Sequence, residues 1–330
     1  MPTYTIQDLQ ALGIHYEHGA KILTDKNRMA MDSELVTAPN AGVPLVFTTY
    51  VDPKVVDVIV SPMKMASIFG EVKKGDWTSS QTQFMVVEST GEVSSYGDFS
   101  ENGVSGVNVN YPERQPYHFQ TNIRAGEREM AIAGAGRLDL AARKQIAAQL
   151  TINKFQNKSY IFGVEGLNCR GMLNDEDLPA TITLETWDEM DGGAVYEEVR
   201  KLYAQLNKQS GGILEADSSM KLIISNNLAP NLAKTNQYNV NVIDQLKKNF
   251  PNMAIETVPE YSAEAGEMVQ LILSEYEGQQ TVDLSFTEKM RTFPLVMMGS
   301  YWEQKRMAGT SGAVIYRPFL VVTALVKAKA

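Results

Sequence analysis

The chain has 330 residues, of which 44% are hydrophobic and 21% are charged, and its formal net charge is −9. These totals are typical of a globular protein that is long enough for two packed bodies. The negative charge argues against broad electrostatic binding to nucleic acid, because such binding depends on massed lysine and arginine side chains. The basic residues are scattered, with pairs such as Lys73–Lys74 rather than a basic stripe.

The sequence predicts neither a membrane-spanning helix nor a secretory signal. A spanning helix needs a run of about 18 apolar residues, and none occurs. Met1–Tyr4 lacks the basic start and apolar core of a signal peptide. The single cysteine, Cys169, cannot form an intramolecular disulfide, which fits a reducing cytoplasm.

The N-terminal segment, residues 1–48, has little regular pattern. Residues 5–12 are compatible with a short helix, and turn-forming residues then keep the chain extended. An irregular segment of this length is typical of a tail or an arm. A helix is expected to begin at Asp52–Pro53, with the aspartate as N-cap and the proline in the first helical position.

Residues 71–124 are predicted to form a long β-hairpin. β-branched and aromatic residues at 71–88 and 107–123 flank a tip that is rich in glycine and serine. About 18 residues from Lys73 to the tip would span on the order of 60 Å, whereas a compact chain of this length has a radius of gyration of about 20 Å. Because an isolated two-stranded hairpin is only marginally stable in water, this hairpin is expected to lie on another subunit.

Residues 127–160 carry the strongest helical pattern. Gly134 and Gly136 predict a break, followed by one continuous helix from about Asp139. Gly163 and Gly166 are expected to end this helix. Apolar residues four positions apart predict its apolar face, which consists of Leu138, Ala142, Ile146 and Leu150.

A second body of alternating helices and strands is predicted from Thr181 onward. Thr186 and Glu189 have the spacing of a capping box. One face of the following helix carries Val195, Val199, Leu202 and Leu206. A buried strand at Met220–Ser225 is followed by expected elements at 226–234, 242–249, 255–258, 269–274 and 282–284, and then by apolar runs at 313–316 and 319–326.

No motif for catalysis, cofactor binding or metal binding stands out. The segment His15–His18 offers two histidines, but a zinc site needs three or four ligands, and the remaining histidine is His118 in the hairpin. Acidic clusters at 175–177 and 188–191 imitate paired carboxylates, although both flank turns or a helix start, where carboxylates favour the helix dipole and solvent. We expect no catalytic, cofactor-binding or metal-binding residues; the alternative is a soluble α/β enzyme that uses these acidic clusters.

Several of the 16 methionines occur in pairs, including Met63 with Met65 and Met297 with Met298. Methionine is flexible and unbranched, so it suits irregular gaps in a core and also interfaces that must accept more than one geometry. The sequence leaves both interpretations open.

The order of these parts resembles the HK97-fold major capsid proteins of tailed double-stranded-DNA bacteriophages. Three phrases support the resemblance. The segment 163–174 (GVEGLNCRGMLN) is similar to the glycine-leucine-asparagine turn after the family's spine helix. The segment 222–228 (LIISNNL) is similar to the strand and helix that open the axial domain, and 315–322 (IYRPFLVV) is similar to the entry to the closing strand.

The resemblance implies an α+β fold that contains an N-terminal arm, a long extended loop, a peripheral domain with a spine helix, and an axial α/β domain. Its expected boundaries are an arm at 1–48, a first peripheral segment at 49–70, the extended loop at 71–124, the peripheral domain at 125–180, the axial domain at 181–290, and a return to the peripheral domain at 291–330.

The family implies a structural protein, not an enzyme, that self-assembles as pentamers and hexamers into an icosahedral shell around double-stranded DNA, which it encloses without sequence-specific binding. The implied partners are portal, scaffold and decoration proteins, and no membrane. The implied locations are the virion capsid and, during assembly, the cytoplasm of the host bacterium. Because only about 48 residues precede the first expected helix, scaffolding is expected from a separate protein. The residues expected at the contact between subunits are Trp77, Phe84, Phe99, Lys73, Lys74 and Arg317.

One rival shares this fold: an encapsulin-type compartment shell, which holds a protein cargo. The long N-terminal arm favours the phage protein, since encapsulins typically begin with a short helix. No cofactor is expected in either case.

Overall fold

The structure, a computed structural model, describes residues 63–99, 101–136 and 138–327. The arm expected at 1–48, the helix expected at Asp52–Pro53 and the histidines at 15 and 18 lie outside the described residues. The described helices are α5 (Met65–Phe69), α6 (Glu127–Ala135), α7 (Leu140–Phe162), α8 (Gly192–Gln209) and α9 (Val242–Asn249), with short 3₁₀ turns η1 (Trp187–Glu189), η2 (Ala229–Ala233), η3 (Pro259–Tyr261) and η4 (Pro318–Leu320). None of them is long and apolar enough to cross a membrane.

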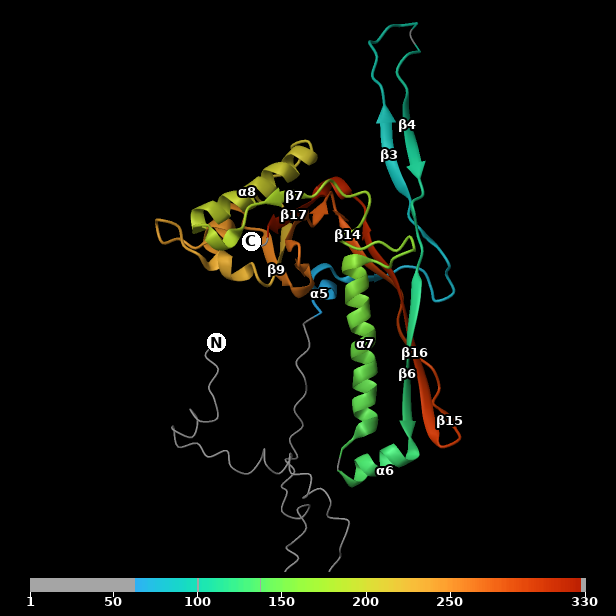
Figure 1. Cartoon of the computed structure of the whole chain (residues 1–330). Helices are drawn as coiled ribbons and strands as arrows, with labels where there is room; N and C mark the ends of the chain where they lie inside the picture. The colour runs from blue at the N-terminus through green and yellow to red at the C-terminus, as the bar shows by residue number, and fades with distance from the viewer. Residues whose placement is uncertain (1–62, 100, 137, 328–330) are drawn as a thin grey trace, which may run out of the picture. The chain divides into compact units, whose positions relative to one another are not determined.

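One sheet is built around the 15-residue strand β16 (Tyr301–Ile315). Its order is β1 (Glu71–Lys73), β14 (Val282–Thr292), β16 and β15 (Val296–Met298), and β6 (Tyr117–Gly126) also pairs with β16. The ladder between β6 and β16 is antiparallel and runs from Gly126 opposite Tyr301 to Tyr117 opposite Thr310. Helix α7 packs against both strands (Figure 1).

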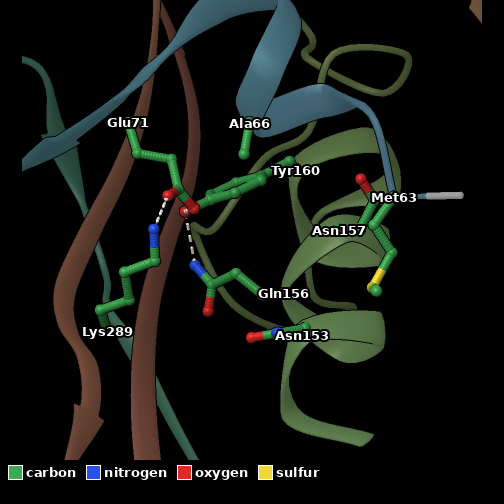
Figure 2. A pocket seen from close by; sticks show the side chains of 8 residues that line it. All are labelled: Met63, Ala66, Glu71, Asn153, Gln156, Asn157, Tyr160 and Lys289. Carbon is green, nitrogen blue, oxygen red and sulfur yellow. Dashed lines mark hydrogen bonds and ion pairs between the residues drawn. The ribbon is translucent and has the colours of Figure 1, made fainter. Parts of the chain in front are cut away.

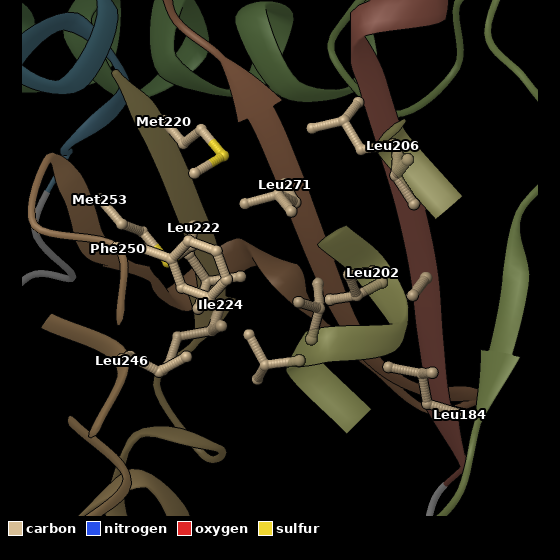
Figure 3. Close-up of a cluster of buried hydrophobic side chains, with 14 of the residues drawn as sticks. Leu184, Leu202, Leu206, Met220, Leu222, Ile224, Leu246, Phe250, Met253 and Leu271 are labelled. Atoms are coloured by element: carbon tan, nitrogen blue, oxygen red, sulfur yellow. The ribbon is translucent and has the colours of Figure 1, made fainter. Parts of the chain in front are cut away.

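A second sheet forms the other body of the described chain. Its order is β7 (Ile182–Leu184), β17 (Val321–Lys327), β11 (Gly266–Leu273), β8 (Met220–Ser225) and β9 (Met253–Val258), and β10 (Ser262–Ala263) pairs with β11. Helices α8 and α9 bury apolar side chains against this sheet, including Leu202, Leu206 and Leu246 (Figure 3). The four residues predicted on one face of α8 are fully buried, so that prediction is confirmed.

Three two-stranded pairs complete the described chain. β2 (Thr82–Gln83) pairs with β5 (Glu113–Arg114), and β3 (Val86–Gly91) pairs with β4 (Ser105–Asn110). β12 (Glu275–Tyr276) pairs with β13 (Gln279–Gln280). The first two pairs follow one another along the predicted hairpin.

The helix break predicted at the two glycines is confirmed. Helix α6 ends at Ala135, and α7 begins after Asp139, whose carboxylate accepts a hydrogen bond of 3.0 Å from the backbone N–H of Ala142. Gly163 caps the end of α7 with a φ of 66°, a conformation that glycine adopts without strain.

The predicted apolar face of this helix is wrong. Ile146 is 64% exposed, whereas Ala148, Ile152, Gln156 and Tyr160 are buried. The buried row lies two positions further along, which corresponds to a rotation of about 200° around the helix. The apolar pattern missed it because three buried residues of α7 are polar: Gln156, Asn157 and Ser159. Gln156 donates to the Tyr160 hydroxyl, and Ser159 donates to Thr310 Oγ1.

One predicted pairing also differs. The segment 117–123 is predicted to return along the hairpin, but it belongs to β6, which pairs with β16. The segment 319–326 contains most of β17, which pairs with β11 and β7 in the second sheet. Strand pairing depends on which apolar face each strand must cover, and the sequence of one strand does not name its partner.

The predicted capping box is wrong as well. Thr186 makes no cap and instead donates to the backbone carbonyl of Lys327 at 3.1 Å. Residues 187–189 form only the turn η1, and α8 begins at Gly192 with Asp191 as its N-cap. The short helix expected at 226–234 is the 3₁₀ helix η2.

Gly312 allows two distant segments to meet in the first sheet. Its φ is 74°, and a Cβ atom there would lie 2.2 Å from the carbonyl oxygen of Arg170. The next residue, Ala313, donates its backbone N–H to this same carbonyl at 2.9 Å. The turn that follows α7 is thereby held against β16.

We predict that Gly312→Ala lowers the free energy of unfolding by at least about 2 kcal/mol, because it adds both a clash and a strained φ. Urea unfolding of the unassembled subunit measures this change. Gly134→Ala is the matched control, since nothing lies within 4 Å of its added Cβ and alanine favours helix α6. Equal stability of the two variants would contradict the proposed role of Gly312.

Candidate assembly surface

The hairpin formed by β3 and β4 has no strand partner within the described chain. Its register runs from Val86 opposite Asn110 to Gly91 opposite Ser105. Every residue of both strands is exposed, and neither strand joins either of the larger sheets (Figure 1). A two-stranded hairpin needs a further packed face to be stable, so this face is the strongest candidate for a contact outside the described chain.

The tip of the hairpin, defined here as residues 92–99 and 101–104, combines apolar and acidic side chains. Val93, Tyr96 and Phe99 are exposed almost completely, and Phe99 reaches 101%. From 86 to 110 the sequence contains four acidic residues and no lysine or arginine. Large apolar side chains held in water mark a surface that binds something.

Two of the predicted interface residues clamp the base of the hairpin within their own chain. Lys74 Nζ lies 2.7 Å from Asp283 Oδ2 and also binds the Tyr316 hydroxyl, which donates to the same carboxylate at 2.9 Å. The Phe84 ring meets the Tyr316 ring edge to face, with centroids 6.2 Å apart. Their contacts therefore fix the position from which the hairpin leaves the sheet.

The other predicted residues differ in their freedom to reach a neighbour. Trp77 is 41% exposed and stacks under the Arg291 guanidinium at 4.3 Å. Lys73 is exposed and lies 4.0 Å from Asp76. Arg317 donates to the Tyr276 carbonyl and to Gln279 Oε1, both at 2.9 Å. Their roles between subunits stay predictions; among the six residues, Phe99 is the one with a fully exposed side chain.

A buried ion cluster joins the returning strand of the hairpin to the turn after α7. Asp175 is buried and accepts from Arg114 at 2.7 Å and from Arg170 at 3.1 Å. Burial in a poorly solvated site strengthens such charge-assisted hydrogen bonds, provided that every charge is paired.

Asn168 connects the same two segments through further hydrogen bonds, and the sequence patterns did not predict it. Its side-chain N–H donates to the Glu113 carbonyl at 2.8 Å, and its own carbonyl accepts from the Gln115 backbone at 2.9 Å. The signal was present in the glycine-leucine-asparagine phrase, because a polar residue at a tight turn often bonds to backbone.

The acidic clusters that suggested an enzyme have structural partners. Glu176 and Asp177 lie 2.9 and 3.5 Å from the Arg170 guanidinium, which also binds Asp175. In the second cluster, Asp188 accepts from Asn231 at 2.8 Å and Asp191 caps α8. Within the described ranges, no group of three or more histidine, cysteine, aspartate or glutamate residues could hold a metal ion.

A polar cavity of about 200 Å³ lies where α5, β1, α7 and β14 meet (Figure 2). Glu71 forms an ion pair with Lys289 and accepts from the Tyr160 hydroxyl at 3.0 Å. Burial, aided by the Glu71 charge, raises the pKa of Tyr160 far above its usual value, so its hydroxyl remains protonated and donates. These polar side chains connect helix α7 to strands β1 and β14 of the first sheet and do not form a reaction centre.

An exposed apolar patch surrounds strand β15. Of its residues, only Met297 and Met298 stood out in the sequence. The β15 patch, as we call it, consists of Leu295, Val296, Met297, Met298 and Trp302, all of which are exposed. Contiguous apolar side chains of this kind are typical of contacts between proteins, which favours the interface interpretation of Met297 and Met298 over core filling.

We predict that Asp175→Ala destabilises the subunit by about 3–5 kcal/mol, because it leaves the buried Arg114 guanidinium without its carboxylate. Urea unfolding measures this effect. Asp177→Ala is the matched control, since its carboxylate is exposed and should change stability by less than about 0.5 kcal/mol. If the two variants unfold alike, the buried cluster does not hold the hairpin base as we describe.

We predict that Cys169 does not react with thiol reagents in the folded subunit at pH 8. Its side chain is buried, and burial raises the thiol pKa to about 11, a rise that the nearby Arg114 charge partly offsets. Colorimetric thiol titration before and after unfolding in guanidinium tests this. Rapid labelling of the folded protein would show that the thiol is accessible.

Comparison with known proteins gives one family and many structural relatives. The family model described as "Pa193 gp26 major capsid protein" matches residues 34–326. No match was found among curated protein sequences.

The structural relatives are capsids. The capsid of Myoviridae phage XM1 has a TM-score of 0.73 at 11% identity, with 87% of this chain and 99% of that chain covered. The capsid of a native GTA particle has a TM-score of 0.61 at 7% identity, with coverage of 84% and 96%. Mycobacterium phage Ogopogo has a TM-score of 0.58 at 9% identity, with coverage of 86% and 98%.

These relatives confirm the HK97-like capsid fold that the sequence predicted. The family match favours a phage capsid protein over a compartment shell, and the proteins in the family are structural subunits rather than enzymes. The chain belongs to the Pa193 gp26 major capsid protein family: it is a structural protein of the virion capsid that associates with further copies of itself to form a shell.

Proposed function

We propose that this subunit forms pentamers and hexamers that close an icosahedral shell around double-stranded DNA, and that each hairpin lies on a neighbouring subunit. The observation that carries the proposal is the exposed β3–β4 pair, which has no partner strand or core within the described chain. A shell supplies the missing face by placing another copy beneath each hairpin.

The tip is expected to contribute much of the binding energy. Burying one exposed phenylalanine stabilises a contact by about 1.5–3 kcal/mol. Aromatic side chains often dominate the energetics of protein interfaces. Since a shell repeats the same contact in every subunit, removing one such ring weakens the whole assembly.

We assign the domains by the likeness to capsid folds. In this assignment residues 71–124 contain the extended loop, 125–180 the peripheral domain with the spine helix α7, and 181–290 the axial domain apart from β14. Strands β14 and β16 go with the peripheral domain, because β16 pairs with β14 and β6, and β17 goes with the axial domain, because it pairs with β11.

The proposed partners are a portal protein, a scaffold protein and a decoration protein, and assembly takes place in the cytoplasm of the host bacterium. The DNA is enclosed rather than gripped. The net charge of −9 supports this last point, because a strongly acidic subunit gains little from contact with phosphates.

Electron microscopy of the purified protein, expressed alone and with its neighbouring genes, tests the proposal. Icosahedral particles, or rings and tubes of capsomers, are expected. DNA-filled particles support the phage shell, and particles filled with a protein cargo would favour a compartment. A uniform monomer or dimer under every condition would refute shell assembly.

We predict that Phe99→Ala leaves a soluble, folded subunit that assembles poorly, because the mutation removes a side chain that is fully exposed in the described part of the chain. The expected loss is at least tenfold in the yield of shells, measured by sedimentation and microscopy, since about 1.4 kcal/mol corresponds to one factor of ten.

Phe99→Leu is the matched control, because it retains apolar bulk at the same position and should assemble nearly as well as the parent protein. Normal shells from Phe99→Ala would show that the aromatic ring at the hairpin tip does not contribute to assembly.

A further inference from the structure

An apolar pocket of about 260 Å³ lies between β6, α6, α7 and the segment that leads into β15. Its lining is largely apolar and comprises Ile123, Ala125, Met130, Ala141, Lys144, Gln145, Leu295 and Trp302. A cavity of about 150 Å³ accommodates benzene in a protein core. The pocket therefore has room for an aromatic side chain.

The pocket continues into the β15 patch, whose exposed apolar side chains extend its surface. Leu295 and Trp302 belong to both. An apolar surface that combines a pocket with an exposed rim suits a partner that inserts one anchor residue and covers the surroundings.

The surroundings of this pocket are basic in an acidic protein. The described residues of 123–145 and 295–306 together contain six lysines and arginines and four acidic residues, whereas the whole chain has a net charge of −9. Two of the carboxylates form ion pairs, Glu129 with Lys144 at 2.6 Å and Glu303 with Arg124 at 3.2 Å. The excess positive charge favours an acidic partner.

The hairpin tip of another copy has both required properties. Phe99 supplies a fully exposed aromatic ring, and it stands between Asp98 and Glu101 in a segment with no basic residue. Val93 and Tyr96 are exposed beside it and match the apolar rim in character.

A chain cannot place its own tip in its own pocket. Residues between the tip and the pocket form the extended strands β4, β5 and β6 (Figure 1). About 20 residues at roughly 3.3 Å each separate the two by on the order of 60 Å. Two different surfaces that pair between copies make a head-to-tail contact, which closes into rings when the rotation allows it.

We propose that the hairpin tip of one copy docks on the β15 end of a second copy, with Phe99 seated in the pocket between α6, α7, β6, β16 and the residue before β15. This inference rests on the proposed shell and deepens it, because it names which surface of the neighbour the hairpin recognises. Apolar burial holds the ring, and the acidic tip meets the basic surroundings.

Cysteine cross-linking in assembled particles tests the docking. The variant Asp98→Cys/Leu295→Cys, which keeps the Phe99 ring and places a thiol beside it, is assembled and then oxidised with copper phenanthroline. The expected result is a ladder of linked chains on a non-reducing gel, which collapses to monomer after reduction. The native thiol does not interfere, because Cys169 is buried with a raised pKa. Asp98→Cys/Met130→Cys provides a second position on the pocket wall if the first pair does not fold.

The matched control is Asp98→Cys/Ala216→Cys, which places the second thiol at an exposed site in the loop between α8 and β8. It should remain monomeric on the gel. Equal ladders in the control and test variants would overturn the assigned site, as would linking of Leu295→Cys alone, because the β15 patch would then pair with itself.

Two further outcomes separate this inference from the proposed function. Normal particles without a ladder in either pocket variant would overturn the docking site while leaving the shell intact. Protection of the Leu295→Cys thiol only in DNA-filled particles would identify nucleic acid as the occupant and likewise overturn the inference. Failure of the parent protein to form particles would count against the shell itself.

Discussion

The described structure depends on the antiparallel ladder between β6 and β16. This ladder satisfies the backbone hydrogen bonds of Tyr117–Gly126, the strand by which the hairpin returns to the body. On its other edge β16 pairs with β14, and α7 packs over the sheet. Because one long strand connects all three parts, the hairpin base, the spine helix and the β15 patch keep a fixed relation, and a shell needs such a relation if its repeated contacts are to have one geometry.

Polar contacts fix the base of the hairpin on both sides. The hairpin leaves the sheet beside Lys74, Asp283 and Tyr316, and it returns beside the buried cluster of Arg114, Asp175 and Arg170. Buried charges are costly unless they are paired, so each cluster is stable in one arrangement of partners and resists others. The carboxylates at 175–177, which resembled a catalytic site in the sequence, therefore bind arginine side chains that orient the base of the hairpin.

The assembly surfaces divide into those that the sequence could indicate and those that it could not. An excess of strand-like, turn-rich residues at 71–124 indicated a hairpin in need of a partner, since propensity and turn chemistry are local properties. The exposure of Phe99 followed from its place near the tip. The pocket beside Trp302 was not predictable, because its walls come from β6, α6, α7, β16 and Leu295, which are brought together by packing alone. The contacts of Lys74 and Phe84 with Asp283 and Tyr316 in their own chain likewise join segments that are far apart in sequence.

The sequence by itself determined the local structure: the helix break at Gly134 and Gly136, the start of α7 near Asp139, the buried face of α8, the hairpin, and the ordered phrases that mark the capsid family. Each of these depends on residues close together in the chain. Only the tertiary structure decided that β6 pairs with β16, that β17 joins the second sheet, and that the buried row of α7 includes Gln156 rather than Ile146. The physical reason is that a strand's partner and a helix's buried face are selected by the surfaces they must cover, and those surfaces are made by segments that lie far away in sequence.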